Sequence, residues 1–311
     1  MRFAMVLSLG MAVLLAAPQF ARADDTPEWK TCISPTNTGA ERLPACSAVI
    51  DAKSVTGRKL AGAYCIRGND RTEKGELDAA LADLNEAISI DATYACAYVN
   101  RGRVYGFKGD YDRAIAEYDT AIKLDARMAL AYNNRGDAWL QKKEFDRAIA
   151  DLNEAIRLNP TFAKSLGNRG DAHYGKRDYA RAIEDYSTEI RISPSTEAYL
   201  NRGESYRESE QLDRAASDYA SVIKLAPTDA RGWRNRGLIR LFKGDNKGAR
   251  ADYDKALLYD PTDAASWNNR GQAKVRSGDR KGAIADFKKA LELRPDNANA
   301  RAALAKLGAA R

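Results

Sequence analysis

The residues that could carry out chemistry in this sequence are few, and most recur at a fixed spacing. His173 is the only histidine, so the chain has one imidazole available as a base and too few for a histidine-based metal centre. Carboxylates such as Asp151 recur at equivalent places, which is typical of a repeated charged surface and not of one active site. The sequence contains no phosphate-binding glycine loop, nucleophile elbow or dinucleotide-binding motif. We therefore expect no enzyme activity, no cofactor and no metal, with His173 packed as a structural side chain.

Length and composition indicate a polar, folded chain. The 311 residues are 44% hydrophobic and 30% charged, with a mean hydropathy of −0.54. Such a chain is too apolar to be disordered and too polar for a membrane protein. Lys and Arg exceed Asp and Glu by 50 to 43, but both signs are interspersed along the whole length. Because nucleic-acid binding needs clustered basic residues, we expect no nucleic-acid partner, and we expect no membrane span.

The first 23 residues have the features of a secretory signal peptide. Arg2 is followed by a mostly apolar run at 5–17, and Ala21-Arg22-Ala23 precedes an acidic pair. The run is too short to cross a hydrocarbon core, which needs about 20 apolar residues. We expect cleavage after Ala23 and a periplasmic or secreted location.

An Asn-Arg-Gly triplet divides the rest of the chain into repeats. Gly102 and Gly136 lie 34 residues apart, and the triplet continues at spacings of 33 or 34 residues as far as Gly271. Gly68, preceded by Ile-Arg, marks a variant first copy. A fixed spacing in this range indicates an array of stacked units. We expect seven repeats, at residues 61–94, 95–128, 129–162, 163–195, 196–229, 230–263 and 264–297.

Each repeat has the hydrophobic pattern of two helices. In the third, apolar residues from Phe145 to Ile156 follow the spacing of an amphipathic helix, and Trp139 belongs to a similar stripe in the first half. Pro160 ends the unit because proline cannot continue a helix interior. Neither helix can bury its apolar face alone, so neighbouring hairpins must stack.

The repeat resembles the tetratricopeptide repeat. Counting from the start of each unit, position 4 is aromatic except at Leu166, position 8 is glycine, position 20 is alanine and position 24 is large. The resemblance implies an all-α, right-handed superhelical solenoid of helical hairpins. Residues 24–60 are expected to form a degenerate N-terminal capping hairpin, and residues 298–311 a C-terminal capping helix that covers the last apolar face.

We expect the four cysteines to be paired, because an even set in an exported protein usually is. Cys32–Cys46 would join the two helices of the leading hairpin. Cys65 and Cys96 lie on the first helices of successive units, which stacking brings side by side, and we expect them to form the second disulfide. Other connectivities remain open.

The arginine of each triplet has two interpretations. It could belong to an anion-binding ladder, or its guanidinium could pair with an acid that recurs sixteen residues later, as Asp151 follows Arg135. We favour the ion pair, because the acid recurs as strictly as the arginine.

The asparagine at repeat position 6 also has two interpretations. The resemblance implies that this position faces the concave groove, where an exposed amide can donate to and accept from the backbone of an extended peptide. The alternative is a capping or inter-repeat hydrogen bond, and both roles remain open. The asparagines are Asn100, Asn134, Asn168, Asn201, Asn235 and Asn269.

Charged residues are expected to line the same groove. Arg103 lies near its start, Asp137, Asp171 and Glu204 make its middle acidic, and Arg231 and Arg234 make its far end basic, with Leu241 and Phe242 as apolar neighbours.

These features lead to two functional hypotheses. The first is an exported, non-enzymatic scaffold that binds a protein or peptide segment in the groove through the asparagine ladder. The second is a structural subunit of an envelope complex that acts through its convex surface or by self-association.

Overall fold

The structure, a computed structural model, describes residues 26–309, and the predicted leader at 1–23 lies outside them. The described residues contain helices and turns but no strands. The helices are α1 (Pro27–Ile33), α2 (Gly39–Asp51), α3 (Gly57–Glu73), α4 (Leu77–Ile90), α5 (Ala95–Phe107), α6 (Tyr111–Leu124), α7 (Ala129–Gln141), α8 (Phe145–Leu158), α9 (Ala163–Gly175), α10 (Tyr179–Ile192), α11 (Thr196–Glu208), α12 (Leu212–Leu225), α13 (Ala230–Phe242), α14 (Asn246–Tyr259), α15 (Ala264–Arg276), α16 (Arg280–Leu293) and α17 (Ala298–Lys306). None of these helices has both the length and the apolar character that crossing a membrane requires.

The chain divides into two compact units, with the boundary after Val104. In the first unit, α1 and α2 pack together, and α3 packs on α2 and on α4. Cys32 and Cys46 form a disulfide between α1 and α2, as predicted, and Trp29 and Val49 are buried in the same cluster. The leading hairpin therefore has a small apolar core and a covalent link.

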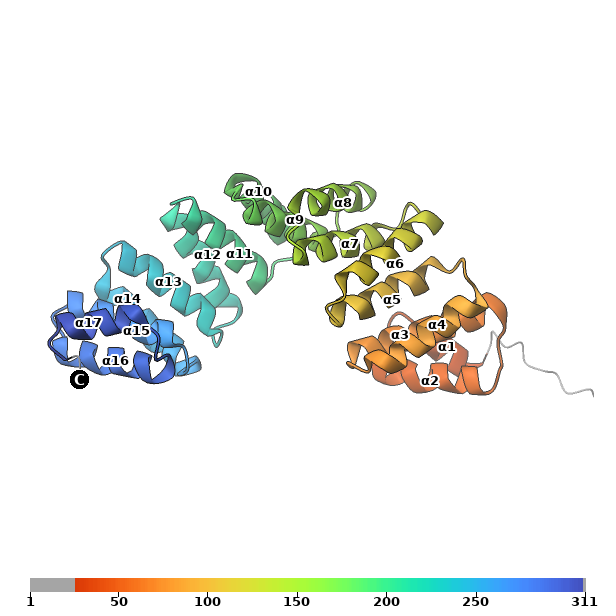
Figure 1. Cartoon of the computed structure of the whole chain (residues 1–311), viewed down its shortest axis with the longest axis horizontal. Helices are drawn as coiled ribbons and strands as arrows, with labels where there is room; N and C mark the ends of the chain where they lie inside the picture. The colour runs from red at the N-terminus through yellow and green to blue at the C-terminus, as the bar shows by residue number, and fades with distance from the viewer. Residues whose placement is uncertain (1–25, 310–311) are drawn as a thin grey trace, which may run out of the picture. The chain divides into compact units, whose positions relative to one another are not determined.

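The second unit is a series of helical hairpins (Figure 1). Its paired helices are α7–α8, α9–α10, α11–α12, α13–α14 and α15–α16, and each hairpin also packs on the next. After them, α17 packs on α16, with Leu304 buried in the same cluster as Phe287. The predicted all-α helical repeat array is thus confirmed.

Small residues allow the two helices of each hairpin to approach closely. A Cβ added at Gly136 would lie 2.8 Å from Cγ of Leu152, and one added at Gly170 would lie 2.7 Å from the ring of Tyr186. Ala148, at repeat position 20, is completely buried. The glycine and alanine of the repeat are therefore packing residues.

In six repeats the triplet arginine of the first helix forms an ion pair with an aspartate of the second helix. The Nε and Nη2 atoms of Arg236 donate to the two carboxylate oxygens of Asp252 at 2.9 and 2.8 Å. This two-point geometry makes a strong, directional ion pair. It confirms the ion-pair interpretation of the arginines. The same pairing joins Arg67 to Asp83, Arg135 to Asp151, Arg169 to Asp185, Arg202 to Asp218 and Arg270 to Asp286.

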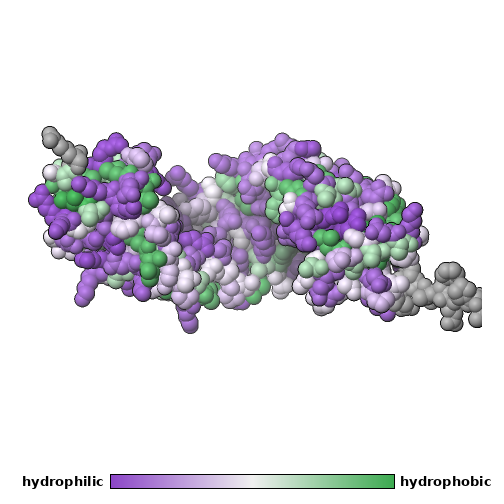
Figure 2. Space-filling view, turned by 90° about the horizontal axis from the view of Figure 1, so that it is seen from below, coloured by the Kyte–Doolittle hydropathy of each residue, from purple (hydrophilic) through white to green (hydrophobic). Residues whose placement is uncertain are grey.

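The face of the molecule seen in Figure 2 is mainly hydrophilic. On the face in Figure 2, purple hydrophilic residues predominate and green hydrophobic residues form small groups between them. Among the large hydrophobic side chains, Phe107, Phe242 and Leu258 are exposed. Scattered apolar side chains of this kind are normal on a protein surface.

Candidate functional site

Most of the residues predicted to line a groove lie on the first helices of the second unit, whereas Asn100 and Arg103 belong to the first unit. Consecutive first helices contact one another, α7 with α9, α9 with α11 and α13 with α15. Hydrogen bonds between side chains of different repeats run across these contacts. We use the name first-helix face for the side chains of Asn134, Asp137, Asn168, Asp171, Asn201 and Glu204.

The asparagines of α7 and α9 are held by a residue that the sequence interpretation overlooked, Asn133. Its Oδ1 accepts from Oγ of Ser165 at 3.0 Å and from Nδ2 of Asn168 at 3.2 Å, and its own amide donates to Oδ1 of Asn134 at 3.1 Å. Asn133 and Asn168 are both buried. The sequence offered one signal for this role of Asn133. It is a polar residue at repeat position 5, which is occupied by Val99 and Leu200 in two other repeats.

Inter-repeat hydrogen bonds also hold Asn100 and Asn201. Nδ2 of Asn100 donates to Sγ of Cys65 at 3.2 Å, and Nδ2 of Asn201 donates to Oδ1 of Asp171 at 3.2 Å. Asn100 is buried, whereas Asn201 is exposed. Of the two interpretations left open for the asparagines, the inter-repeat hydrogen bond applies to Asn100 and Asn168, because stacking buries them between adjacent first helices. Asn235 and Asn269 are half-buried, and each accepts from the residue before it.

Asp171 is the centre of the acidic part of the first-helix face. Its Oδ1 accepts a hydrogen bond from the hydroxyl of Tyr186 at 2.6 Å as well as from Asn201. Asp171 is exposed, yet the protein around it removes enough water from its carboxyl to raise the pKa, and the charge of Asp137 adds to this effect.

Glu189 on α10 extends this acidic region and was not predicted. A Cβ added at Gly167 would lie 2.8 Å from its carboxylate oxygens, so the carboxylate lies against the α9 backbone. Burial, together with the negative charge of Asp171, raises the pKa of Glu189 to about 7, although Lys164 opposes this shift. Asp171 and Glu189 therefore carry negative charge that the protein only partly compensates.

Glu204 has a different environment from Asp171. Its carboxylate accepts from Nε of Arg207 at 3.0 Å and from the hydroxyl of Tyr219 at 3.2 Å. The hydrogen bond from Arg207 lowers the pKa of Glu204. This acid is therefore already neutralised within its own repeat.

The predicted basic residues are also engaged within the chain. Arg231 pairs with Asp229 at 2.7 Å and with Glu197 at 2.9 Å, and Arg234 lies 3.8 Å from Asp263. Arg103, in the first unit, donates to Oδ1 of Asn69 at 2.6 Å and also pairs with Glu73.

The expectation that Leu241 lines the face is wrong. Leu241 is 2% exposed and packs in an apolar cluster with Tyr253 and Ala273, because helical periodicity turns it towards the next repeat. Phe242, its neighbour in sequence, is exposed.

His173 is packed as predicted. It is buried beside Asp185, with 3.9 Å between Nε2 and Oδ2, and burial lowers its pKa. Asp185 already binds Arg169 through both carboxylate oxygens, so the imidazole lies next to a structural ion pair.

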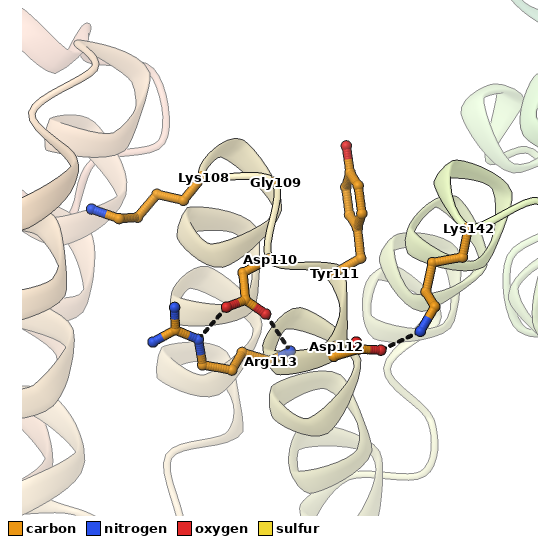
Figure 3. Close-up of a pocket in the computed structure, with 7 residues that line it drawn as sticks. All are labelled: Lys108, Gly109, Asp110, Tyr111, Asp112, Arg113 and Lys142. Atoms are coloured by element: carbon orange, nitrogen blue, oxygen red, sulfur yellow. Dashed lines mark hydrogen bonds and ion pairs between the residues drawn. The ribbon is translucent and has the colours of Figure 1, made fainter.

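A hollow of about 510 Å³ lies at the start of α6. The ion pairs drawn there in Figure 3 are structural. Asp110 accepts from the backbone N–H of Arg113 and pairs with its guanidinium. Asp112 and Lys142 point toward each other from successive hairpins and form an ion pair. The same inter-repeat pair recurs as Lys176–Asp146 and Lys243–Asp213, so it is part of the architecture.

The expected second disulfide is not formed. Cys65 and Cys96 are free thiols that pack in the same cluster, as stacking predicted. Asn100 provides a hydrogen bond to Cys65, so the buried sulfur is stabilised without a covalent link.

The fold and this surface define a helical repeat array of the kind that acts as a protein-interaction scaffold. Tetratricopeptide repeat profiles match residues 99–163, 144–197, 168–230, 200–269 and 264–297, and a TPR repeat profile matches residues 68–106. The chain therefore belongs to the tetratricopeptide repeat family. No curated protein matches its sequence.

Solved structures share the fold at low sequence identity. The C-terminal part of a TPR repeat-containing protein from Cytophaga hutchinsonii is 20% identical, with a TM-score of 0.61, over 77% of this chain and 99% of that one. PilW, a type IV pilus biogenesis factor, is 17% identical, with a TM-score of 0.60, over 68% and 98%. YrrB, described as a TPR protein with an unusual peptide-binding site, is 21% identical, with a TM-score of 0.52, over 59% and 95%.

Proposed function

We propose that this chain is an extracytoplasmic, non-enzymatic scaffold that binds an extended segment of a partner protein on its first-helix face. The observation that carries the proposal is the exposed pair of Asn201 and Asp171, which presents an amide and a carboxylate 3.2 Å apart. The amide can exchange hydrogen bonds with any peptide backbone, and the carboxylate can accept from a cationic side chain.

The electrostatics of the face favour a basic segment. Burial raises the pKa of both Asp171 and Glu189, and a neighbouring negative charge adds to each shift, that of Asp137 on Asp171 and that of Asp171 on Glu189. A lysine or arginine side chain placed between them would relieve this repulsion and gain charge-assisted hydrogen bonds. We infer that the partner segment carries such a side chain opposite Asp171, while Asn201 holds its backbone.

The asparagine ladder has two parts in this proposal. Asn134, Asn201, Asn235 and Asn269, which are exposed or half-buried, serve the partner, whereas the buried Asn100 and Asn168 join neighbouring repeats. Binding would lose little conformational entropy, because the surface is carried by packed helices.

The Cys32–Cys46 disulfide supports the extracytoplasmic location, since stable structural disulfides form in oxidising compartments. Mass spectrometry of protein recovered from the exported fraction tests this point. An N-terminus close to Asp24 is expected, and a retained leader would contradict it.

The binding proposal is tested with two labelled peptides of equal length, one alternating alanine with lysine and the other alanine with glutamate. Fluorescence anisotropy at low salt should show binding of the lysine peptide only. The double variant Asp171→Asn/Glu189→Gln should weaken that binding at least about tenfold, which corresponds to about 1.4 kcal/mol.

The matched control, measured at about pH 8 where Glu189 is charged, is Glu144→Gln/Glu184→Gln, which removes an exposed acid at the N-cap of α8 and another on α10 and changes net charge equally. If both double variants weakened binding of the lysine peptide equally, the peptide would be held by long-range attraction to the net charge of the protein. That result would contradict a site at Asp171 and Glu189. A concentration-dependent oligomer whose assembly is unaffected by the Asp171 and Glu189 substitutions would favour the assembly-subunit hypothesis instead.

A further inference from the structure

The free cysteines of the first unit have a feature that peptide binding does not explain. Cys65 on α3 is 2% exposed, whereas Cys96 at the start of α5 is partly exposed. Cys96 packs against the same buried cluster that contains Cys65, and Asn100 donates to the Cys65 sulfur at 3.2 Å. One thiol is therefore partly accessible, and the other is buried in the same cluster.

Both sulfur-bearing side chains line a cavity of about 290 Å³ in the first unit. Tyr94 and Asn69 belong to the same wall, as does Cys32, whose own sulfur is already bonded to Cys46. The cavity has room for a small molecule next to Cys96.

The two thiols have unequal reactivity. The hydrogen bond from Cys65 stabilises the Cys96 thiolate and lowers the pKa of Cys96 to about 7. The same interaction, with burial, raises the pKa of Cys65 well above its usual range. A thiol whose pKa is close to the ambient pH is the most effective attacking group in thiol–disulfide exchange.

We propose that Cys65 and Cys96 form a redox-active dithiol that exchanges with low-molecular-weight disulfides entering this cavity. The Cys96 thiolate attacks one sulfur of the disulfide, forms a mixed disulfide and releases the other half as a thiolate. Cys65 then loses its proton and attacks the Cys96 sulfur, which releases the second half as a thiolate. The protein loses two electrons and two protons, and the small disulfide becomes two thiols.

The product is a Cys65–Cys96 disulfide that links α3 to α5. The thiol pair of the structure is then the reduced state of a reversible couple, whereas Cys32–Cys46 is a permanent link. This assignment is independent of the first-helix face, because all its residues lie in the first unit.

The test uses the full mature chain equilibrated in glutathione buffers of increasing oxidised fraction, then quenched with acid and mapped without reduction. We expect a Cys65–Cys96 peptide that appears and disappears reversibly while Cys32–Cys46 stays intact. Two thiols that never pair, or a Cys65–Cys96 bond that reduced glutathione cannot open, would overturn the proposal.

Two variants assign the roles of the cysteines. With oxidised glutathione, Cys65→Ser should accumulate a stable adduct on Cys96, because the resolving thiol is missing. Cys96→Ser should form an adduct on Cys65 at least ten times more slowly. Equal rates in the two variants would contradict the order of attack.

A measurement on the unmodified reduced chain keeps the test independent of variant folding. Iodoacetamide should label Cys96 at least ten times faster than Cys65. Faster or equal labelling of Cys65 would refute the assignment of Cys96 as the attacking group.

Discussion

Asp252→Asn is expected to destabilise the second unit strongly, because this carboxylate holds two arginines. Asp252 is 2% exposed, binds both Nε and Nη2 of Arg236, and lies 2.9 Å from Nη1 of Arg240. Asparagine has the same shape but no charge, and its amide turns a donor toward a guanidinium that also donates. Removing one partner of a buried ion pair costs about 3 to 5 kcal/mol. We expect about 3 kcal/mol, since the arginine side chains are 19% and 34% exposed and keep some hydration.

Asp254→Asn on the same helix is the matched control. Asp254 is 51% exposed and pairs with Nη1 of Arg270 at 2.7 Å. An exposed ion pair contributes about 0 to 1 kcal/mol, so this variant should be nearly as stable as the unmodified chain. Both variants lose one negative charge from α14, and only burial and the number of bonded arginines differ.

Urea unfolding followed by far-ultraviolet circular dichroism measures the difference. Because repeat arrays can unfold in parts, the free energies of unfolding are compared only where the variants show the same dependence on urea concentration. Hydrogen exchange then shows whether the lost stability is located in α13 and α14. High salt should abolish the small effect at Asp254 and leave most of the effect at Asp252. A loss at Asp252 below about 1 kcal/mol, or no greater than that at Asp254, would refute the ion-pair reasoning.

Three further outcomes are expected. Gly170→Leu should lower the melting temperature, at a cost of about 3 kcal/mol, because its side chain would enter the space of the Tyr186 ring; an unchanged midpoint would contradict the packing role. Glu189 has a raised pKa of about 7, so its contribution to stability is lost as pH rises through that value, and Glu189→Gln should raise the melting temperature at about pH 8 but have little effect at about pH 5. Cys46→Ser should cost about 2 to 4 kcal/mol and increase hydrogen exchange in α1 and α2 only; loss of protection in the second unit would be inconsistent with a local disulfide.

Local pattern was enough to predict the helices and their order. Six first helices begin at the residues where the repeat spacing places them: α5, α7, α9, α11, α13 and α15. The apolar stripe, the glycine at position 8 and the proline stops are short-range features, so each repeat specifies its own hairpin. The capping helix starts at Ala298, close to the expected position, whereas α3 begins at Gly57, before the first full repeat at 61.

The sequence by itself determined the repeated contacts, because seven copies of one pattern must solve the same packing problem in the same way. The pairing of Arg236 with Asp252 could be predicted for this reason, since an arginine and an acid recur at these two positions in every unit. Tertiary structure alone decided which polar groups remain accessible. Asn168 and Asn201 occupy the same repeat position, yet Asn133 binds and buries the first, while the second stays exposed beside Asp171. Whether an asparagine is buried depends on the side chains of the neighbouring hairpin, and the residue spacing within one repeat does not specify those side chains.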